Sequence, residues 1–491
     1  MGGARTAIYN WLYARRRGGA FVLRIEDTDE DRQKEGAYDA ILGGLRWLGA
    51  QWDEGPDVGG ALGPYRQSER LVRYRDRATE LRAKGFAYPC YCTPKELEEA
   101  RQRARAEHRP PGYDGRCRNL TTEERAAFEA EGRTAALRLD VGRVWGGGNP
   151  IVVTDVIRGE VVFDTATLDD FVILKSNGTA AYNFAVTVDD ADMAITHVIR
   201  ADEHLSNTPK QIVAARALGV EPPIFAHISM VLAPDRSKLS KRHGATGVEE
   251  FRAQGYLPEA LANYLVLLGW SFPDEREFFT LTDAAKVFDL DRVSRSAAVY
   301  DVKKLTWMNA QYLRQLVPKD LLERVRPFLD ALSLAPEARG RMADDAYVTE
   351  AVLLVRDRVQ TLRELAVTLR YFFEDPDPQG FDPKGVEKHF CDATLAEARL
   401  RACAEAFAPT DFLVESLEHA LDAHPAVRGA GSRAPFIHAA RLAVTGRTVG
   451  PGLFELLHAL GKETVTRRLR TCIEFIRGGR FEIEKTAARS S

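Results

Sequence analysis

Two stretches of the chain alternate between strand-like and helix-like patterns, and this alternation limits the folds open to it. Short apolar runs and apolar positions at helical spacing succeed one another over residues 1–68 and again over residues 178–233. We interpret the two stretches as halves of one doubly wound parallel sheet, separated by an insertion. The predicted elements are helix Ala4–Arg15, strand Phe21–Ile25 and helix Lys34–Leu48, then strands near Tyr182–Val188 and Ala194–Ile199, helix Pro209–Ala217 and strand Phe225–Val231.

The other segments have a different character. The insertion, residues 69–177, begins with a charged helix over Glu69–Lys84 and continues with β-rich stretches over Thr134–Asp140 and Ile151–Leu174. The chain after residue 234 is predicted to be helical, with long amphipathic helices at Asp344–Leu365, Leu395–Phe407, Asp411–Ala423 and Pro451–Leu460. A chain of 491 residues is long enough for several such domains.

Composition adds few constraints on function. The net charge of −3 is almost neutral, so any contact with nucleic acid must come from local basic clusters. The sequence contains no apolar run long enough to span a membrane. Six cysteines in so long a chain do not form a disulfide scaffold, and a reducing cytoplasm is the expected location.

The segment Ser237-Lys238-Leu239-Ser240-Lys241-Arg242 carries two lysines in a loop that follows an apolar run. Such a loop can fold over a polyphosphate and place two ammonium groups where negative charge develops as pyrophosphate leaves. The alternative is a solvated basic loop without a specific role.

Several further motifs occur in a fixed order along the chain. They are Gly2-Gly3-Ala4-Arg5-Thr6-Ala7, Arg24-Ile25-Glu26-Asp27-Thr28-Asp29, Asp53-Glu54-Gly55-Pro56-Asp57, Gly63-Pro64-Tyr65-Arg66-Gln67-Ser68, Val198-Ile199-Arg200-Ala201-Asp202-Glu203-His204, Lys304-Leu305-Thr306-Trp307-Met308-Asn309, Ala443-Val444-Thr445-Gly446 and Gly452-Leu453-Phe454-Glu455-Leu456. The lysine loop resembles the "KMSKS" signature of class I aminoacyl-tRNA synthetases, in the Lys-Leu-Ser-Lys-Arg form common in the glutamate branch. The other motifs resemble the glutamyl-tRNA synthetase family of bacterial type, and the resemblance covers essentially the whole chain.

The resemblance implies an α/β class I Rossmann-type catalytic domain, with helical stem-contact and all-helical anticodon-binding domains after it. The implied activity is ATP-dependent activation of L-glutamate to glutamyl-adenylate, then transfer to the 3′ end of tRNA(Glu), by a cytoplasmic monomer that uses ATP with Mg²⁺. The implied domains are residues 1–68 and 178–233 (catalytic), 69–177 (acceptor-stem-binding insertion), 234–317 (stem contact) and 318–491 (anticodon binding).

The same resemblance implies roles for single residues. Lys238 and Lys241 would stabilise pyrophosphate, with Lys241 as the first choice. Glu26 would receive the α-ammonium group of glutamate, and Arg200 would contact the substrate through its planar fork. Tyr182 would line the amino-acid pocket, with a core tyrosine as the alternative. The candidates on the ATP side are Gly2, Gly3, Ser240, Glu203 and His227.

Cys90, Cys92 and Cys117 resemble a structural zinc site found in part of the family, because three thiolates suit Zn²⁺, which takes four ligands. The usual fourth position is Asn119 here. Tyr113 stands at the spacing of a tyrosine ligand in a related paralogue, and His108 is a further candidate. Free cysteines in a vestigial site are the alternative.

Arg358 and Arg441 fall near positions that read the anticodon in the family. Arginine suits both base edges and phosphates. Taken alone, each residue is more typical of a solvated helix position, and Arg441 lies in the better-matching segment.

The family begins with a strand and a His-Ile-Gly-Gly or His-Met-Gly-Gly segment, of which only Met1-Gly2-Gly3 is recognisable here. We expect either a misassigned start codon or a poor catalyst. The missing histidine segment leaves open a tRNA-binding paralogue with impaired catalysis. A second alternative, independent of that segment, is a paralogue that glutamylates a modified tRNA base. The second normally lacks an anticodon-binding domain.

Overall fold

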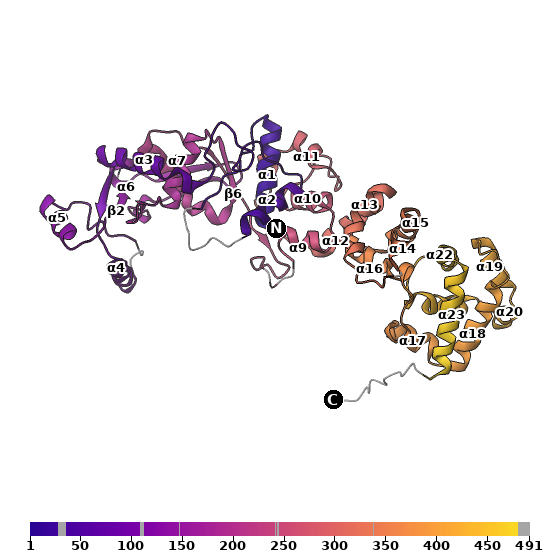
Figure 1. Ribbon diagram of the computed structural model, residues 1–491. Helices are drawn as coiled ribbons and strands as arrows, with labels where there is room; N and C mark the ends of the chain where they lie inside the picture. Colours follow the sequence, from indigo (N-terminus) through magenta and orange to yellow (C-terminus); the bar gives the residue numbers. More distant parts are fainter. Residues whose placement is uncertain are drawn as a thin grey trace. The chain divides into compact units, whose positions relative to one another are not determined.

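Short parallel strands lie at the centre of the N-terminal part of the protein. In the computed structural model (Figure 1), β6 (His197–Ala201) lies in this part of the chain. It pairs in parallel with β7 (Ile224–Ile228), and helix α8 (Thr208–Leu218) makes the crossover between them. Parallel bridges also join Val22 to Glu54 and Ile25 to Arg66. The structure describes residues 1–27, 36–108, 112–146, 148–240, 242, 245–336 and 338–479. These findings confirm the predicted α/β class.

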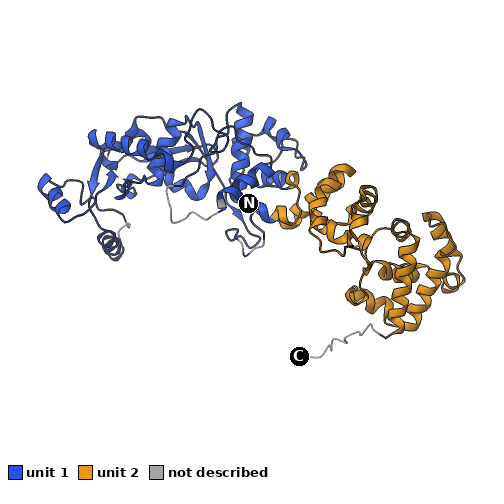
Figure 2. Cartoon of the chain, in the orientation of Figure 1, with its two compact units in different colours: residues 1–250, 261–301 blue, residues 251–260, 302–491 orange. Residues whose placement is uncertain are grey.

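The chain forms two compact units (Figure 2). The first contains residues 1–250 and 261–301, and the second contains residues 251–260 and 302–491. The five predicted domain boundaries are finer than this division and stay predictions. Among the described residues, no helix is both long and apolar enough to cross a membrane.

The predicted strand Tyr182–Val188 is wrong, because these residues begin the helix α7 (Tyr182–Asp192). All of Phe184–Asp189 is buried. The apolar residues Tyr182, Phe184, Val186 and Val188 stand at every second position, which is the spacing of a strand, and this alternation explains the wrong prediction. The predicted strand Phe21–Ile25 is present only as the two isolated bridges at Val22 and Ile25.

The insertion contributes antiparallel strands. Strand β2 (Ala136–Leu139) pairs with both β1 (Ala87–Cys90) and β5 (Val172–Leu174), and β3 (Ile151–Asp155) forms a hairpin with β4 (Gly159–Phe163). One hydrophobic cluster runs from Tyr74 in this region to Phe184 and Phe225 next to the parallel strands. The insertion and the parallel strands therefore share a core.

The helices of the first unit are α1 (Gly2–Arg17), α2 (Ala37–Trp47), α3 (Leu71–Ala83), α4 (Pro94–Ala106), α5 (Thr122–Ala130), α6 (Val141–Trp145), α7, α8 and α11 (Leu281–Val287). A short parallel pair joins β8 (Val231–Leu232) to β9 (Ala298–Val299).

The second unit is helical throughout its described residues and has its own core. The predicted single helix Asp344–Leu365 is wrong, because it is two helices, α15 (Asp345–Val355) and α16 (Leu362–Phe373). The Thr361 side chain accepts a hydrogen bond from the backbone of Glu364 and so caps a new helix start. The other helices are α12 (Val302–Gln315), α13 (Pro318–Asp330), α14 (Ala338–Met342), α17 (Pro383–Phe390), α18 (Ala393–Phe407), α19 (Val414–Ala423), α20 (Pro425–Ala430), α21 (Ala434–Thr445), α22 (Leu453–Leu460) and α23 (Lys462–Arg477), while α9 (Val248–Ala253) and α10 (Pro258–Leu267) contain the boundaries between the units.

Candidate active site

A cavity of about 760 Å³ opens in the first unit, between the start of α1, strand β6 and the loop after β8. Its lining brings together seven of the residues predicted to bind ATP or glutamate: Gly2, Gly3, Glu26, Tyr182, Arg200, Glu203 and Lys238. They come from segments up to 236 residues apart in the sequence, from Gly2 to Lys238. Their convergence follows from the parallel topology, which gathers strand ends at one edge of a sheet.

Helix α1 supplies backbone N–H groups at one side of the cavity. Its first turn contains Gly2 and Gly3, and a Cβ atom built on either glycine meets nothing within 4 Å. The protein's own atoms therefore leave space at this helix N-terminus, where the helix dipole favours an anion such as phosphate.

Arg200 lies within β6, and hydrogen bonds to His227 and Thr208 hold its guanidinium group. Its Nε donates to Nε2 of His227 (3.1 Å), and a terminal nitrogen donates to Oγ1 of Thr208 (2.9 Å). Burial lowers the pKa of Arg200, and the neighbouring Tyr182 and Asp190 act in the opposite direction. His227 is fully buried and lies behind the cavity lining, where it supports Arg200. Its role as a neighbour of ATP stays a prediction.

Tyr182 lies at the start of α7 and is 39% exposed, so it is not a core tyrosine. Burial of the hydroxyl and the negative charge of Glu26 raise its pKa, although Arg200 acts in the opposite direction. Tyr182, Glu26 and Arg200 thus influence one another electrostatically.

Arg24 holds Glu26 in place. One terminal nitrogen of its guanidinium lies 3.1 Å from Glu26, and the other lies 2.8 Å from Asp190 on α7. Burial disfavours the charge on Arg24, but Asp190, Glu26 and Asp189 together raise its pKa above the ordinary value. Asp189 is fully buried and also binds Arg70, Tyr74 and Gln67. The sequence alone did not single out Asp189 or Asp190.

The lysine loop begins as a tight turn after β8. The backbone N–H of Ala233 donates to the carbonyl of Ser237 (2.8 Å), and the Ser237 hydroxyl donates to Asp235 (2.7 Å). Lys238 then reaches Glu203, with 2.6 Å between Nζ and a carboxylate oxygen. Its hydrogen bond lowers the pKa of Glu203. Ser240 is exposed, and Lys241 lies outside the described residues.

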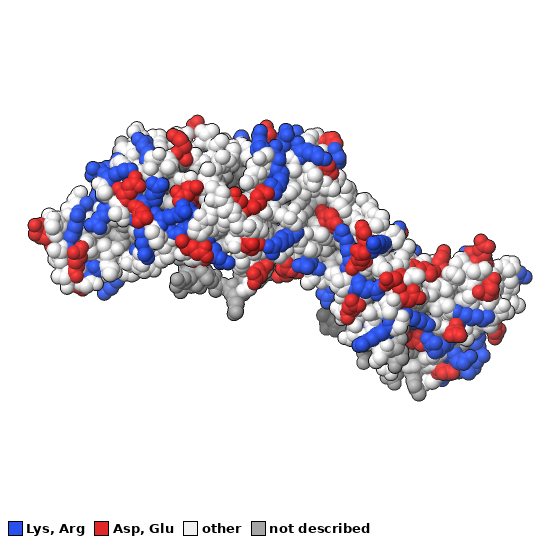
Figure 3. All heavy atoms as spheres, turned by 45° about the horizontal axis from the view of Figure 1, so that its top comes forward, with Lys and Arg blue, Asp and Glu red and all other residues white. Residues whose placement is uncertain are grey.

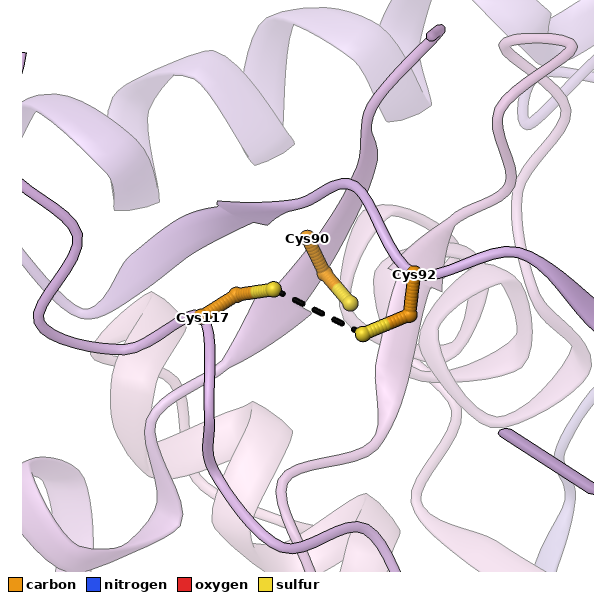
Figure 4. A group of neighbouring side chains, drawn as sticks. All are labelled: Cys90, Cys92 and Cys117. Atoms are coloured by element: carbon orange, nitrogen blue, oxygen red, sulfur yellow. Dashed lines mark hydrogen bonds between the residues drawn. The ribbon is translucent and has the colours of Figure 1, made fainter. Parts of the chain in front are cut away.

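Cys90, Cys92 and Cys117 point toward one another at the end of β1 (Figure 4). Their sulfur atoms all lie within 4.8 Å of one another, and those of Cys92 and Cys117 are 3.6 Å apart. Hydrogen bonds from Cys117 and Cys92 lower the pKa of Cys90, and the cluster raises the pKa of Cys92. A tetrahedral Zn²⁺ with Zn–S bonds of about 2.3 Å holds its sulfurs about 3.8 Å apart, so this geometry fits the ion.

Tyr113 lies beside this cluster. Its hydroxyl is 3.5 Å from the sulfur of Cys90 and accepts a hydrogen bond from the backbone of Cys117 (2.9 Å). Asn119 and His108 are both exposed. Of the three candidate fourth ligands, Tyr113 has the contacts that a ligand needs.

In the second unit, Arg358 lies in the break between α15 and α16. It lines a cavity of about 310 Å³ together with Arg447, Thr448 and Pro451. Arg441 is 9% exposed and donates to the carbonyl of Pro451. Arg358 therefore faces a surface cavity, whereas Arg441 supports its wall.

Comparisons with known proteins agree with this architecture. A family model described as "tRNA synthetases class I (E and Q), catalytic domain" matches residues 1–307, and one described as "Anticodon binding domain" matches residues 320–473. The two matches define a class I aminoacyl-tRNA synthetase with an anticodon-binding domain.

The relatives give the specificity. The chain is 50% identical to a glutamate–tRNA ligase from Moorella thermoacetica over 481 residues, which cover 97% of this chain and 96% of that one. It is 51% identical to a glutamate–tRNA ligase from Desulforudis audaxviator over 479 residues, covering 97% and 94%. A crystal structure of a glutamate tRNA ligase from Elizabethkingia meningosepticum, in complex with its amino acid, superimposes with a TM-score of 0.82 at 30% identity, covering 97% and 96%. The chain belongs to the glutamate–tRNA ligase family and is an aminoacyl-tRNA synthetase that uses ATP and Mg²⁺.

Proposed function

We propose that the cavity of the first unit binds L-glutamate and ATP and carries out both steps of glutamate–tRNA ligation. The observation that supports this assignment is the shared lining: a helix N-terminus with open space and a lysine for phosphates, beside an arginine and a carboxylate for an amino acid. Each group complements one charged part of the two substrates.

In the first step, an oxygen of the glutamate α-carboxylate attacks the α-phosphorus of ATP, and the bond to the leaving pyrophosphate breaks. In the second, the terminal ribose hydroxyl of the tRNA attacks the adenylate carbonyl, and AMP leaves. The chemistry forms no bond to the protein, so catalysis consists of positioning and charge stabilisation. Mg²⁺ enters with ATP, held mainly by phosphates and water.

Recognition of the amino acid is assigned to three residues. Arg200 pairs with the side-chain carboxylate of glutamate, Glu26 accepts hydrogen bonds from the α-ammonium group, and Tyr182 borders both. Glutamine in place of glutamate would leave the partly buried guanidinium of Arg200 without a charged partner. This loss disfavours the binding of glutamine more than the small size difference between the two amino acids could.

Stabilisation of pyrophosphate is assigned to Lys238 and Lys241, with Gly2, Gly3 and Ser240 beside the phosphates. Glu203 acts on ATP binding through its pair with Lys238. A charge placed to meet the developing pyrophosphate lowers the barrier to activation.

Recognition of tRNA(Glu) is assigned in part to the second unit, with Arg358 as the contact residue and Arg441 as a contributor to the same surface. Acidic and basic side chains are interspersed on the face drawn in Figure 3, so affinity for RNA requires local contacts rather than a field of one sign. The match of the anticodon-binding model disfavours a paralogue that modifies a tRNA base. The relatives over the whole chain are ligases by name, and nothing in these comparisons favours an impaired paralogue.

We also assign a structural Zn²⁺ to Cys90, Cys92, Cys117 and Tyr113. In that role the ion would tie the end of β1 to the loop that carries Tyr113 and Cys117. The protein is proposed to act as a monomer in the cytoplasm, where reduced thiols and tRNA occur together.

The proposal is tested by glutamate-dependent exchange between ATP and pyrophosphate, with tRNA(Glu) present and absent. We expect exchange with glutamate and tRNA, and little with glutamine. The Arg200→Lys variant keeps the charge but loses the planar fork, so it should need much more glutamate for the same rate while its KM for ATP changes little. Retained tRNA binding without any exchange in the unmodified chain would favour the non-catalytic alternative.

A further inference from the structure

A fully buried carboxylate–imidazole pair lies directly behind Arg200. His227 on β7 and Asp155 at the end of β3 are 0% and 1% exposed, and Nδ1 of His227 lies 2.6 Å from Oδ2 of Asp155. Neither side chain is part of the cavity lining, whereas Arg200 is. Buried polar groups of this kind are costly unless they are fully hydrogen-bonded.

The second ring nitrogen of His227 faces hydrogen-bond donors. Nε2 lies 3.1 Å from Nε of Arg200 and 3.3 Å from the hydroxyl of Thr208. A guanidinium has only donors, so Nε2 must be the unprotonated acceptor, and the ring proton is on Nδ1 and is donated to Asp155. Contacts on both sides of the ring therefore select one neutral tautomer.

Asp155 is held as firmly as the ring. Oδ1 accepts from the backbone N–H groups of Ile157 (3.0 Å) and Arg158 (2.8 Å), and Oδ2 accepts from the backbone N–H of His227 (3.0 Å). Burial raises the pKa of Asp155, but these hydrogen bonds and the one from the ring outweigh it and leave the pKa below its ordinary value. Asp155 is thus a fixed, charged acceptor.

We propose that Asp155 and His227 are positioning residues that set the orientation of Arg200 for the side-chain carboxylate of glutamate. The chain of contacts runs from a turn in the insertion, through the imidazole, to a guanidinium in the cavity. Arg158 reinforces it, because it donates to the carbonyl of His227 (3.1 Å) and to Asp202 after β6 (2.7 Å). This inference rests on the assignment of Arg200 to the amino acid.

Asp155→Asn tests the tautomer. The two backbone N–H groups at Oδ1 would hold the amide oxygen on their side, so the amide nitrogen would face Nδ1 of His227. That nitrogen is a donor, which drives the ring proton to Nε2, where it meets the N–H of Arg200. A comparable substitution in the serine-protease triad traps the wrong tautomer in the same manner. We expect the KM for glutamate in tRNA aminoacylation to rise about 10- to 100-fold, with the KM for ATP within about 2-fold.

Two substitutions at His227 form a matched pair. Glutamine can place its amide oxygen near the position of Nε2 and keep an acceptor for Arg200, whereas asparagine can imitate only the Nδ1 side. We expect His227→Gln to keep the KM for glutamate at least about 5-fold lower than His227→Asn does, with similar melting temperatures for the two. Equal KM values would mean that His227 only fills space, and would overturn the inference. This pair decides the matter if Asp155→Asn does not fold.

The double variant Asp155→Asn/His227→Gln tests whether Asp155 acts through the ring. The Asp155→Asn change should have little effect on the KM for glutamate in this background, because no tautomer remains to be set. Full additivity, or equal rises of the KM values for glutamate and ATP, would overturn the inference. Arg200→Lys distinguishes failure of the Arg200 assignment from failure of the positioning role. If Arg200→Lys leaves the KM for glutamate unchanged, the assignment of Arg200 to the amino acid fails. If Arg200→Lys raises this KM but Asp155→Asn leaves it unchanged, only the positioning role fails.

Discussion

The ammonium group of Lys238 lies 2.6 Å from a carboxylate oxygen of Glu203. Both side chains line the cavity, and both are largely exposed to solvent. An exposed ion pair contributes little to folding, about 0–1 kcal/mol. Its significance is that a phosphate entering the cavity must compete with Glu203 for Lys238.

Glu203→Gln should therefore lower the KM for ATP by about 2- to 5-fold, because a weak competing interaction is removed.

Lys238→Ala should slow glutamate activation about 10²- to 10³-fold, as expected when a charge that stabilises the leaving group is lost. Steady-state exchange kinetics measure both. A higher KM for ATP in Glu203→Gln would instead show that Glu203 contacts ATP itself.

Gly3→Ala should separate folding from ligand binding. The protein has open space for the added methyl group, and alanine favours a helix, so the melting temperature should stay equal or rise slightly. If ATP occupies that space, its KM should rise about 10-fold or more. Gly340→Ala in α14 is the control, since its Cβ also meets nothing within 4 Å and it lies in the other unit. An unchanged KM for ATP in Gly3→Ala would remove the glycine turn from the ATP site.

The purified protein should contain about one zinc ion per chain, since a structural site takes four ligands around a single ion. Cys92→Ser and Cys117→Ser should lose it, and Tyr113→Phe should bind it more weakly, as measured by elemental analysis after gel filtration. The exposed Cys391 provides the control, because Cys391→Ser should keep the full content. Absence of zinc from the unmodified protein, even after incubation with the ion, would establish a vestigial thiol cluster.

Arg358→Ala should weaken tRNA binding and reduce its salt dependence by about one released counterion, without loss of stability. Arg441→Ala should lower the melting temperature as well, because the buried guanidinium supports the carbonyl of Pro451. Binding titrations at several salt concentrations, beside thermal melts, distinguish the two. Identical behaviour of the two variants would contradict the different roles assigned to them.

Asp375 gives the second unit a defined acid sensitivity. Burial raises its pKa, but Arg467 and Arg468 outweigh burial and lower it to about 2. A carboxyl group with a depressed pKa stabilises the fold above its unfolded pKa of about 3.8, and this contribution is lost as the pH falls toward about 2. Asp375→Asn should cost about 1–2 kcal/mol at pH 7, allowing for partial exposure, and less below pH of about 4.

Urea unfolding followed by circular dichroism at several pH values measures this contribution. Arg467→Gln is the control, because its guanidinium is exposed whereas that of Arg468 is buried, so it should cost less than Asp375→Asn. A deficit in Asp375→Asn that stays constant down to pH of about 2 would show that ionisation of Asp375 is not its cause.

The sequence predicts the class of fold from local patterns, whereas the site residues were named through the resemblance of short motifs to a known family. Helices α1 and α2 have apolar residues at helical spacing. Short motifs at strand ends meet because the ends of parallel strands lie at one edge of a sheet. The helix α7 was missed because its apolar residues fall at every second position, as they do in a strand. The break before α16 was missed because a single capping threonine, Thr361, decides it.

Contacts between residues that are far apart in the chain cannot be predicted from a single sequence. Asp155 and His227 are 72 residues apart and lie in separate sequence segments, so neither local pattern points to the other. The burial of Arg441 is equally invisible, because arginines on helix surfaces and beneath loops have the same local sequence context. Such relationships depend on which surfaces the tertiary fold brings together.

The hairpin β3–β4 has a consequence for engineering this enzyme. Its turn places Asp155 and Arg158 beside β7, where both bind His227, so the insertion cannot be exchanged as an independent domain. A chimera that exchanged the whole of residues 69–177 would replace Asp155, which supports the proposed amino-acid site, and a deletion would leave His227 without its counter-charge. Swaps intended to change the RNA partner are therefore better cut outside this hairpin, so that the recipient keeps its own turn.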